Sequence, residues 1–156
     1  MLDEKLNACI ETAIGREEEA VVFYNDLAGQ VNDDAARETL LWIGDEEKKH
    51  KAFLVQFRDK GQGPSNMRIA DVTYYKIAEH LEEPEASDAM RREEVFLLAA
   101  HRELRSFQFY SELAALYEEG SEIRDMLLRI ANEELKHKEK MEYLYANTSF
   151  PQTDGG

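Results

Sequence analysis

The stretch IGDEEKKHK at residues 43–51 recurs as IANEELKHK at residues 130–138, with six of nine letters identical. Both copies keep a glutamate followed three positions later by a histidine: Glu47–His50 and Glu134–His137. Apolar residues flank both copies at spacings of three and four, which is the pattern of one helix face. Residues three apart share such a face, so each Glu–His pair is predicted to point inward with its apolar neighbours.

A second repeat precedes each copy at nearly the same distance. REEEAVVFYNDLA at residues 16–28 aligns with RELRSFQFYSELA at residues 102–114, with six of thirteen letters identical. In each segment one glutamate, Glu17 or Glu103, interrupts the apolar stripe. The glutamates that fall on other faces are predicted to be solvated: Glu18, Glu19, Glu46 and Glu133. The two halves of the chain are therefore predicted to be similar helical hairpins with matching polar positions.

The fold class predicted from this pattern is all-α, a four-helix bundle made of two antiparallel hairpins. The helices are expected at about residues 3–30, 33–59, 88–118 and 121–146, with caps at Asn32 or Asp33 for the second and Ser87 or Asp88 for the third. A short helix is expected within residues 67–81. The crossover, at about residues 60–87, is long enough to run the length of a bundle and restart at the other end. The predicted domain covers residues 1–147, and residues 148–156 are predicted to form a loose C-terminal tail.

Composition narrows the classes of function. The net charge of −14 disfavours nucleic acid and an anionic membrane surface as partners. The single Cys9 excludes an intramolecular disulfide and a four-cysteine metal centre within the chain. No apolar run approaches the length of about 20 residues that spans a bilayer, and the N-terminal residues do not resemble a signal peptide. The expected setting is the cytoplasm.

The four inward-facing glutamates and two histidines are predicted to meet in one layer. Glu17 and Glu47 each lie about 13 residues from the turn that joins their helices, hence level with each other at roughly 20 Å from it. Four buried carboxylates cost several kcal/mol each unless they are paired or protonated. Two divalent cations would neutralise them. Protonated carboxylates that share hydrogen bonds with the imidazoles are the alternative, and a metal-free scaffold is the corresponding alternative function.

Carboxylates combined with imidazoles suit iron or manganese, because Mg²⁺ and Ca²⁺ favour oxygen ligands alone and structural Zn²⁺ favours Cys and His. In the arrangement we expect, Glu47 and Glu134 bridge two metals. Glu17 and His50 complete one site, and Glu103 and His137 the other, although spacing alone does not decide which carboxylates bridge. Tyr24 and Tyr110 lie two turns beyond Glu17 and Glu103 and could hydrogen-bond a carboxylate ligand or simply fill the core.

These motifs resemble the ferritin-like di-iron carboxylate superfamily, and within it the rubrerythrin-related proteins. The resemblance rests on REEEAVVFYNDLA, DEEKKH, RELRSFQFY and NEELKH, and it covers most of residues 10–145. It implies a ferritin-like bundle with two iron ions, manganese being the alternative, held by six ligands: Glu17, Glu47, His50, Glu103, Glu134 and His137. It also implies redox chemistry of the ferroxidase or peroxidase type toward dioxygen or hydrogen peroxide.

Two departures from the family pattern qualify what the resemblance implies. Typical rubrerythrins carry a four-cysteine rubredoxin domain, and with only Cys9 the chain is expected to take electrons from a separate donor protein. Ser106 stands where they have an extra glutamate, which leaves a symmetric site like the ferroxidase centre of bacterioferritin. We expect a homodimer. Iron storage or sequestration without dedicated turnover is the alternative function.

Overall fold

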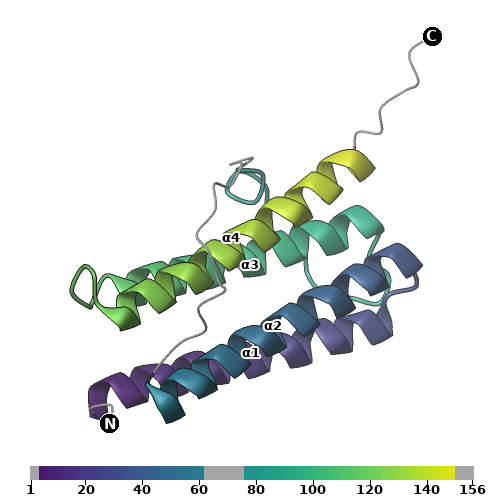
Figure 1. Ribbon diagram of the computed structural model, residues 1–156. Coiled ribbons are helices and arrows are strands. Elements are labelled where there is room, and N and C mark those ends of the chain that lie inside the picture. The colour runs from purple at the N-terminus through teal and green to yellow at the C-terminus, as the bar shows by residue number, and fades with distance from the viewer. Residues whose placement is uncertain (1–3, 62–75, 150–156) are drawn as a thin grey trace.

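The computed structural model describes residues 4–61 and 76–149. Within those ranges the chain forms four helices and no strand: α1 (Glu4–Gln30), α2 (Asp34–Lys60), α3 (Arg92–Ala114) and α4 (Glu122–Ser149). Figure 1 shows α1 lying along α2 and α3 lying along α4, each pair as a hairpin. The predicted all-α four-helix bundle of the ferritin-like type is confirmed. In the described part of the chain, no helix is both long and apolar enough to cross a membrane.

The ends of α2 follow the expected capping chemistry. The Asp33 carboxylate accepts a hydrogen bond from the Ala36 backbone N–H at 2.8 Å, so the predicted N-cap is confirmed. At the other end Gly61 adopts a φ of +69°, and its N–H donates to the Phe57 carbonyl. This left-handed conformation is one that glycine adopts without steric cost, and it ends the helix within two residues of the predicted position.

The third helix is shorter than predicted. It begins at Arg92, and neither Ser87 nor Asp88 caps it; instead the Arg91 backbone N–H donates to the Glu94 carboxylate at 3.2 Å. A side chain from within the first turn therefore supplies the partner that a preceding Ser or Asp would otherwise provide. The helix ends at Ala114. The backbone hydrogen bonds that follow join residues three apart, as in a 3₁₀ turn, and the chain then reaches Gly120.

The expected short helix in residues 67–81 is not found in the part that the structure describes. Residues 76–81 form a single turn, in which the N–H groups of His80 and Leu81 donate to the Ile77 carbonyl. Residues 67–75 lie outside the described residues. The last helix, α4, extends to Ser149, beyond the predicted end at 146, and the remaining predicted tail lies outside the described residues.

The apolar core is divided into two clusters along the bundle. One gathers around Tyr24, Leu40, Ile43 and Met141. The other gathers around Ile10, Leu54, Tyr110, Leu127 and Ile130. The buried glutamates and histidines of the repeated motifs belong to neither cluster and stand between them in the sequence of every helix. The helices therefore bring a polar layer into the interior with apolar packing on both sides.

A buried ion pair on α4 also binds residues 77–79, which precede α3 in the chain. Lys138 is 2% exposed, and its Nζ lies 2.8 Å from a carboxylate oxygen of Glu142 and 2.8 Å from one of Glu79. The second oxygen of Glu142 accepts backbone N–H groups of Ile77 and Ala78. The network thus satisfies a buried lysine and two backbone donors at once. Sequence reasoning missed the network because Ile77, Ala78 and Glu79 are far in sequence from the α4 residues that they contact.

Replacing Lys138 with methionine is expected to lower the free energy of unfolding by roughly 3 kcal/mol, because the Glu142 charge remains buried without its cation. Urea unfolding followed by circular dichroism measures this. The control is Lys136→Met, which breaks the more exposed pair with Glu133 and should cost under about 1 kcal/mol. Equal losses in the two variants would show that the buried network does not hold the structure together.

Candidate metal centre

The six residues predicted as ligands all lie in the bundle interior. Each is at most 3% exposed: Glu17, Glu47, His50, Glu103, Glu134 and His137. The helices α1 and α3 contribute one glutamate each, and α2 and α4 contribute one Glu–His pair each. The heptad stripes therefore place all six side chains where the sequence predicted, in one layer across the four helices.

The layer divides into two overlapping groups of four residues. One group contains Glu17, Glu47, His50 and Glu134; the other contains Glu47, Glu103, Glu134 and His137. Within each group, one potential ligand atom from every residue lies within 4.8 Å of all the others. Glu47 and Glu134 belong to both groups, so the geometry matches two adjacent cation sites that share two carboxylates. Their role as metal ligands stays a prediction.

Buried polar atoms of this layer lack hydrogen-bond partners. They include a single carboxylate oxygen on each of three glutamates, both oxygens of Glu134 and the Nδ1 atoms of both histidines: Glu17 Oε2, Glu47 Oε1, Glu103 Oε2, Glu134 Oε1 and Oε2, His50 Nδ1 and His137 Nδ1. An unsatisfied buried polar atom costs about 1–3 kcal/mol, and more if it is charged. Seven such atoms converging on one place fit a group of cations that would satisfy all of them.

Contacts across the two hairpins confirm how closely these atoms converge. His50 Nδ1 lies 2.6 Å from Glu134 Oε1, and His137 Nδ1 lies 3.3 Å from Glu47 Oε1. Neither contact has the geometry of a hydrogen bond, so both Nδ1 atoms remain without a hydrogen-bond partner. The two imidazole rings are nearly parallel, with centroids 5.6 Å apart. Nitrogen and carboxylate oxygen atoms held this close are arranged as ligands of a common cation would be.

The electrostatics of the layer favour retained protons when no cation is bound. Burial, followed by repulsion from neighbouring carboxylates, raises the pKa values of Glu17 and Glu134 well above the usual value. Burial alone would raise the pKa of Glu47, but the nearby Glu17, His137 and His50 side chains outweigh it and lower that pKa well below the usual value. Burial opposes the charged form of His137, yet Glu103 and Glu47 prevail and raise its pKa to about 10. Cations that bind here must displace these protons.

Two tyrosines fix the glutamates of α1 and α3. The Tyr24 hydroxyl donates to Glu103 Oε1 at 3.0 Å, and the Tyr110 hydroxyl donates to Glu17 Oε1 at 2.5 Å. The predicted tyrosine–carboxylate bonds are confirmed, but each one crosses to the other hairpin. Burial, and then nearby carboxylates, raise the pKa values of both phenols well above the usual value, which keeps them as donors. Each glutamate is left with one oxygen free to face the layer.

Replacing Tyr24 or Tyr110 with phenylalanine is expected to leave the number of bound metal ions unchanged and to weaken metal affinity by about 10–100-fold. That is the usual effect of removing a group that orients a ligand. Competition with a chromophoric chelator measures the affinity. Tyr143→Phe, at a tyrosine that is 54% exposed, is the control. If the Tyr24 and Tyr110 variants bind metal as the control does, these phenols only fill the core.

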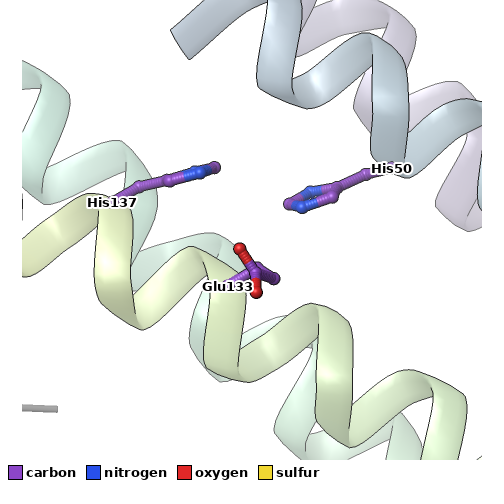
Figure 2. Close-up of side chains that lie close together, drawn as sticks. All are labelled: His50, Glu133 and His137. Carbon is purple, nitrogen blue, oxygen red and sulfur yellow. The ribbon is translucent and has the colours of Figure 1, made fainter. Parts of the chain in front are cut away.

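The structure corrects the prediction for Glu133. This residue was expected to be solvated, but its side chain is only 24% exposed and lies within reach of His50 and His137. Figure 2 shows its carboxylate beside the two imidazoles. Its Oε1 atom also accepts a hydrogen bond from Lys136 at 3.1 Å. Helix periodicity separates the faces of Glu133 and Glu134 but does not reveal that α2 comes close to both.

Trp42 contacts the layer from outside. Its ring meets the His137 ring edge-to-face, with centroids 5.3 Å apart, and Lys140 Nζ lies 3.8 Å from the centre of the indole. The contact restricts the rotation of the imidazole, which helps to keep Nδ1 turned toward the carboxylates.

Comparison with known proteins gives one family match. Residues 2–58 match the family model Rubrerythrin, a segment that contains Glu17, Glu47 and His50. No curated protein and no solved structure matches the chain significantly. The α3–α4 half, which lies outside the matched segment, supplies the corresponding Glu103, Glu134 and His137. The four-helix architecture and the match over residues 2–58 fit a ferritin-like, rubrerythrin-related protein.

Proposed function

We propose that the chain is a di-iron carboxylate protein that reacts with dioxygen or hydrogen peroxide. The observation that carries the proposal is the pair of buried four-residue groups that share Glu47 and Glu134. Two divalent cations carry four positive charges, which balance the four carboxylates once His50 and His137 are neutral. The same four carboxylates without cations would leave an unsatisfied and largely desolvated polar layer in the core.

The ligand types favour iron, with manganese as the second candidate. Each group contains three carboxylates and one imidazole, a mixture that suits these two metals better than Mg²⁺, Ca²⁺ or structural Zn²⁺. Iron bound at both sites would supply the electrons that reduce dioxygen or peroxide. We propose iron because the family match favours it and because both sites share carboxylates that keep two metals close together.

The residues of the chain have distinct tasks in this reaction. Glu47 and Glu134, which belong to both groups, would hold the cations as a pair, while the two histidines and the outer glutamates would each serve one site. Tyr24 and Tyr110 keep Glu103 and Glu17 in place. The apolar clusters above and below exclude bulk water from the layer. The described residues include one cysteine, Cys9, so electrons for repeated turnover are proposed to come from a separate donor protein.

Rapid mixing tests the proposed activity. Metal-free protein is loaded anaerobically with two Fe²⁺ per chain and mixed with either dioxygen or hydrogen peroxide in a stopped-flow spectrometer. Oxidation of the bound iron is expected to be faster than that of free Fe²⁺ under the same conditions. A rate no faster than that of free iron would contradict the redox function. The faster of the two oxidants distinguishes a ferroxidase from a peroxidase.

Iron storage without dedicated turnover is the competing proposal, and it uses the same two sites. Storage requires a closed shell of many chains, whereas the homodimer that we propose encloses no such space. Light scattering combined with iron titration separates the two. A dimer that takes up two iron ions per chain and no more fits the redox protein. A large assembly that continues to take up iron fits storage.

A further inference from the structure

A cavity of about 210 Å³ lies on the α1/α3 side of the bundle, next to the polar layer. Six residues line it: Arg16, Glu19, Ala20, Arg102, Arg105 and Ser106. Ala20 follows Glu17 by three residues, and Ser106 follows Glu103 by three. Because residues three apart share a helix face, two small side chains occupy the places one turn beyond the two outer glutamates. Their small size helps to leave this space open.

Two of the lining arginines are held by aromatic rings of the facing helix. The Arg16 guanidinium lies 4.1 Å from the centre of the Phe109 ring, and the Arg102 guanidinium lies 3.9 Å from that of Phe23. A guanidinium stacked on a ring keeps its N–H groups directed outward in the plane, so they remain available as donors. Both arginines are therefore oriented in advance beside the cavity.

Neither of these arginines has a protein counterion in the described part of the chain. No described carboxylate oxygen lies within the 4 Å ion-pair distance of Arg16 or Arg102. Other arginines donate hydrogen bonds to carboxylates or carbonyls: Arg37, Arg58, Arg91, Arg92, Arg105 and Arg124. In a chain with a net charge of −14, two oriented guanidiniums without counterions are conspicuous.

The four stacking residues come from the repeated segment. Arg16 corresponds to Arg102, and Phe23 corresponds to Phe109, each at an offset of 86 residues. The repeat thus supplies a matched pair of cation–ring contacts, one from each hairpin, on either side of the same cavity. Tyr24 and Tyr110 show the same reciprocal arrangement toward the outer glutamates. Among the identical letters of the repeat, the tyrosines therefore hold the outer glutamates, and the arginines and phenylalanines form the stacked pairs beside this cavity.

We propose that the α1/α3 cavity binds a small oxyanion, a phosphate or a small carboxylate, between Arg16 and Arg102. Guanidiniums bind both kinds of oxyanion through paired N–H donors, and the Ser106 hydroxyl adds a further donor at the wall. A water molecule takes about 30 Å³ in the liquid, so the cavity has room for an anion of a few heavy atoms. Arg105 is already paired with Glu83, and Glu19 offsets part of the positive charge, so Arg16 and Arg102 are the two cations left to bind the anion.

The site is tested on the metal-free full-length chain, so the result does not depend on the proposed redox function. Phosphate and malonate are titrated separately at constant ionic strength, with chloride as the balancing salt. The side-chain N–H signals of Arg16 and Arg102 are followed by NMR. Saturable shifts with phosphate or malonate, and none with chloride, are expected. The anion that binds more tightly identifies the class of ligand.

Variants make the test specific. Arg16→Gln and Arg102→Gln should each weaken binding by about tenfold or more, since a hydrogen bond to a charged group is removed. Glu19→Gln should strengthen binding, because it removes the negative charge at the cavity wall. Arg58→Gln, at an arginine paired elsewhere with Glu11, should bind as the wild type does. Shifts that do not saturate, or equal affinity in the Arg102→Gln and Arg58→Gln variants, would overturn the proposal.

Discussion

Replacing Glu134 with glutamine is expected to abolish stable binding of both metal ions. Glu134 belongs to both four-residue groups and is fully buried, so its loss removes a ligand from each site at once. We expect the affinity at both sites to fall by more than the roughly 10–100-fold that follows loss of an orienting group. The same result is expected for Glu47→Gln, or for replacement of either residue with alanine. Elemental analysis after dialysis against a weak chelator gives the number of ions retained per chain.

Two further variants make this prediction quantitative. Glu17→Gln alters a residue that belongs to one group only, so it should lose one ion and retain the other. Glu46→Gln, at a residue paired with Lys49 and outside both groups, should retain both, although the Glu46 side chain is only 20% exposed and not solvated as predicted. Full metal content in the Glu134→Gln variant, or equal losses in the Glu134→Gln and Glu46→Gln variants, would show that the shared carboxylates do not hold the metals.

The second large effect is an increase in metal-induced stabilisation as pH rises. Free metal at about 1,000 times its dissociation constant stabilises a protein by about 4 kcal/mol. For a chain of this size that corresponds to roughly 8–16 °C in melting temperature. We expect a gain of this order at pH 8 and a much smaller one at pH 5.5. Protons compete with cations for Glu17, Glu134 and His137, and this competition weakens as pH rises.

The metal-free protein should show the opposite trend. The raised pKa values of Glu17 and Glu134 mean that the folded state keeps protons that the unfolded chain loses above its ordinary pKa of 4.5. The pKa of His137 is raised from 6.5 to about 10, so between pH 6.5 and 10 the folded state also keeps a proton on His137 that the unfolded chain loses. The folded state therefore binds more protons than the unfolded state, and its stability falls as pH rises. Glu47, whose pKa is lowered, is ionised in both states above pH 4.5 and adds no slope there.

Thermal unfolding with and without Mn²⁺ at a series of pH values measures both trends, and Mn²⁺ avoids the rapid oxidation of Fe²⁺ in air. Calorimetry in two buffers with different ionisation enthalpies counts the protons released on binding. The account predicts release of protons at pH 6–7 and a widening difference in melting temperature toward pH 8. A difference that is constant across this range would mean that metal binds away from the titrating layer.

The fold followed from the sequence where local chemistry determined it. The helical spacing of apolar residues and the glycine turns at Gly61 and Gly120 are local features. The helix boundaries next to these two turns were therefore predicted within a few residues. The start of α3 was misplaced because Glu94 caps the helix from inside its first turn. The bonds of Lys138 and Glu142 to residues 77–79 were missed because they depend on where that segment meets α4.

The same distinction holds for the candidate site. Each helix shows its inward-facing glutamate or Glu–His pair through its own periodicity, so sequence reasoning found all six residues of the layer. What it could not give was the pairing between helices. The Tyr24–Glu103 and Tyr110–Glu17 bonds, the position of Glu133 and the stacking of Arg16 on Phe109 all depend on how the hairpins face each other.

The repeat explains why those cross-hairpin contacts come in matched pairs. A side chain on α1 contacts the counterpart region of α3, and the equivalent side chain on α3 contacts α1 in return. Residues with the same letter at an offset of 86 therefore make equivalent contacts, each with the opposite hairpin. A sequence repeat gives the residue types of such a set, and the packing of the hairpins gives their partners.

The central claim is that two cations occupy the buried layer of carboxylates. Anomalous X-ray diffraction from crystals of the iron-loaded protein, measured on both sides of the iron absorption edge, tests it most directly. The account predicts two iron peaks per chain, both within bonding distance of Glu47 and Glu134. Peaks elsewhere on the molecule, or an iron-free layer in which these acids face one another across an empty space, would contradict it.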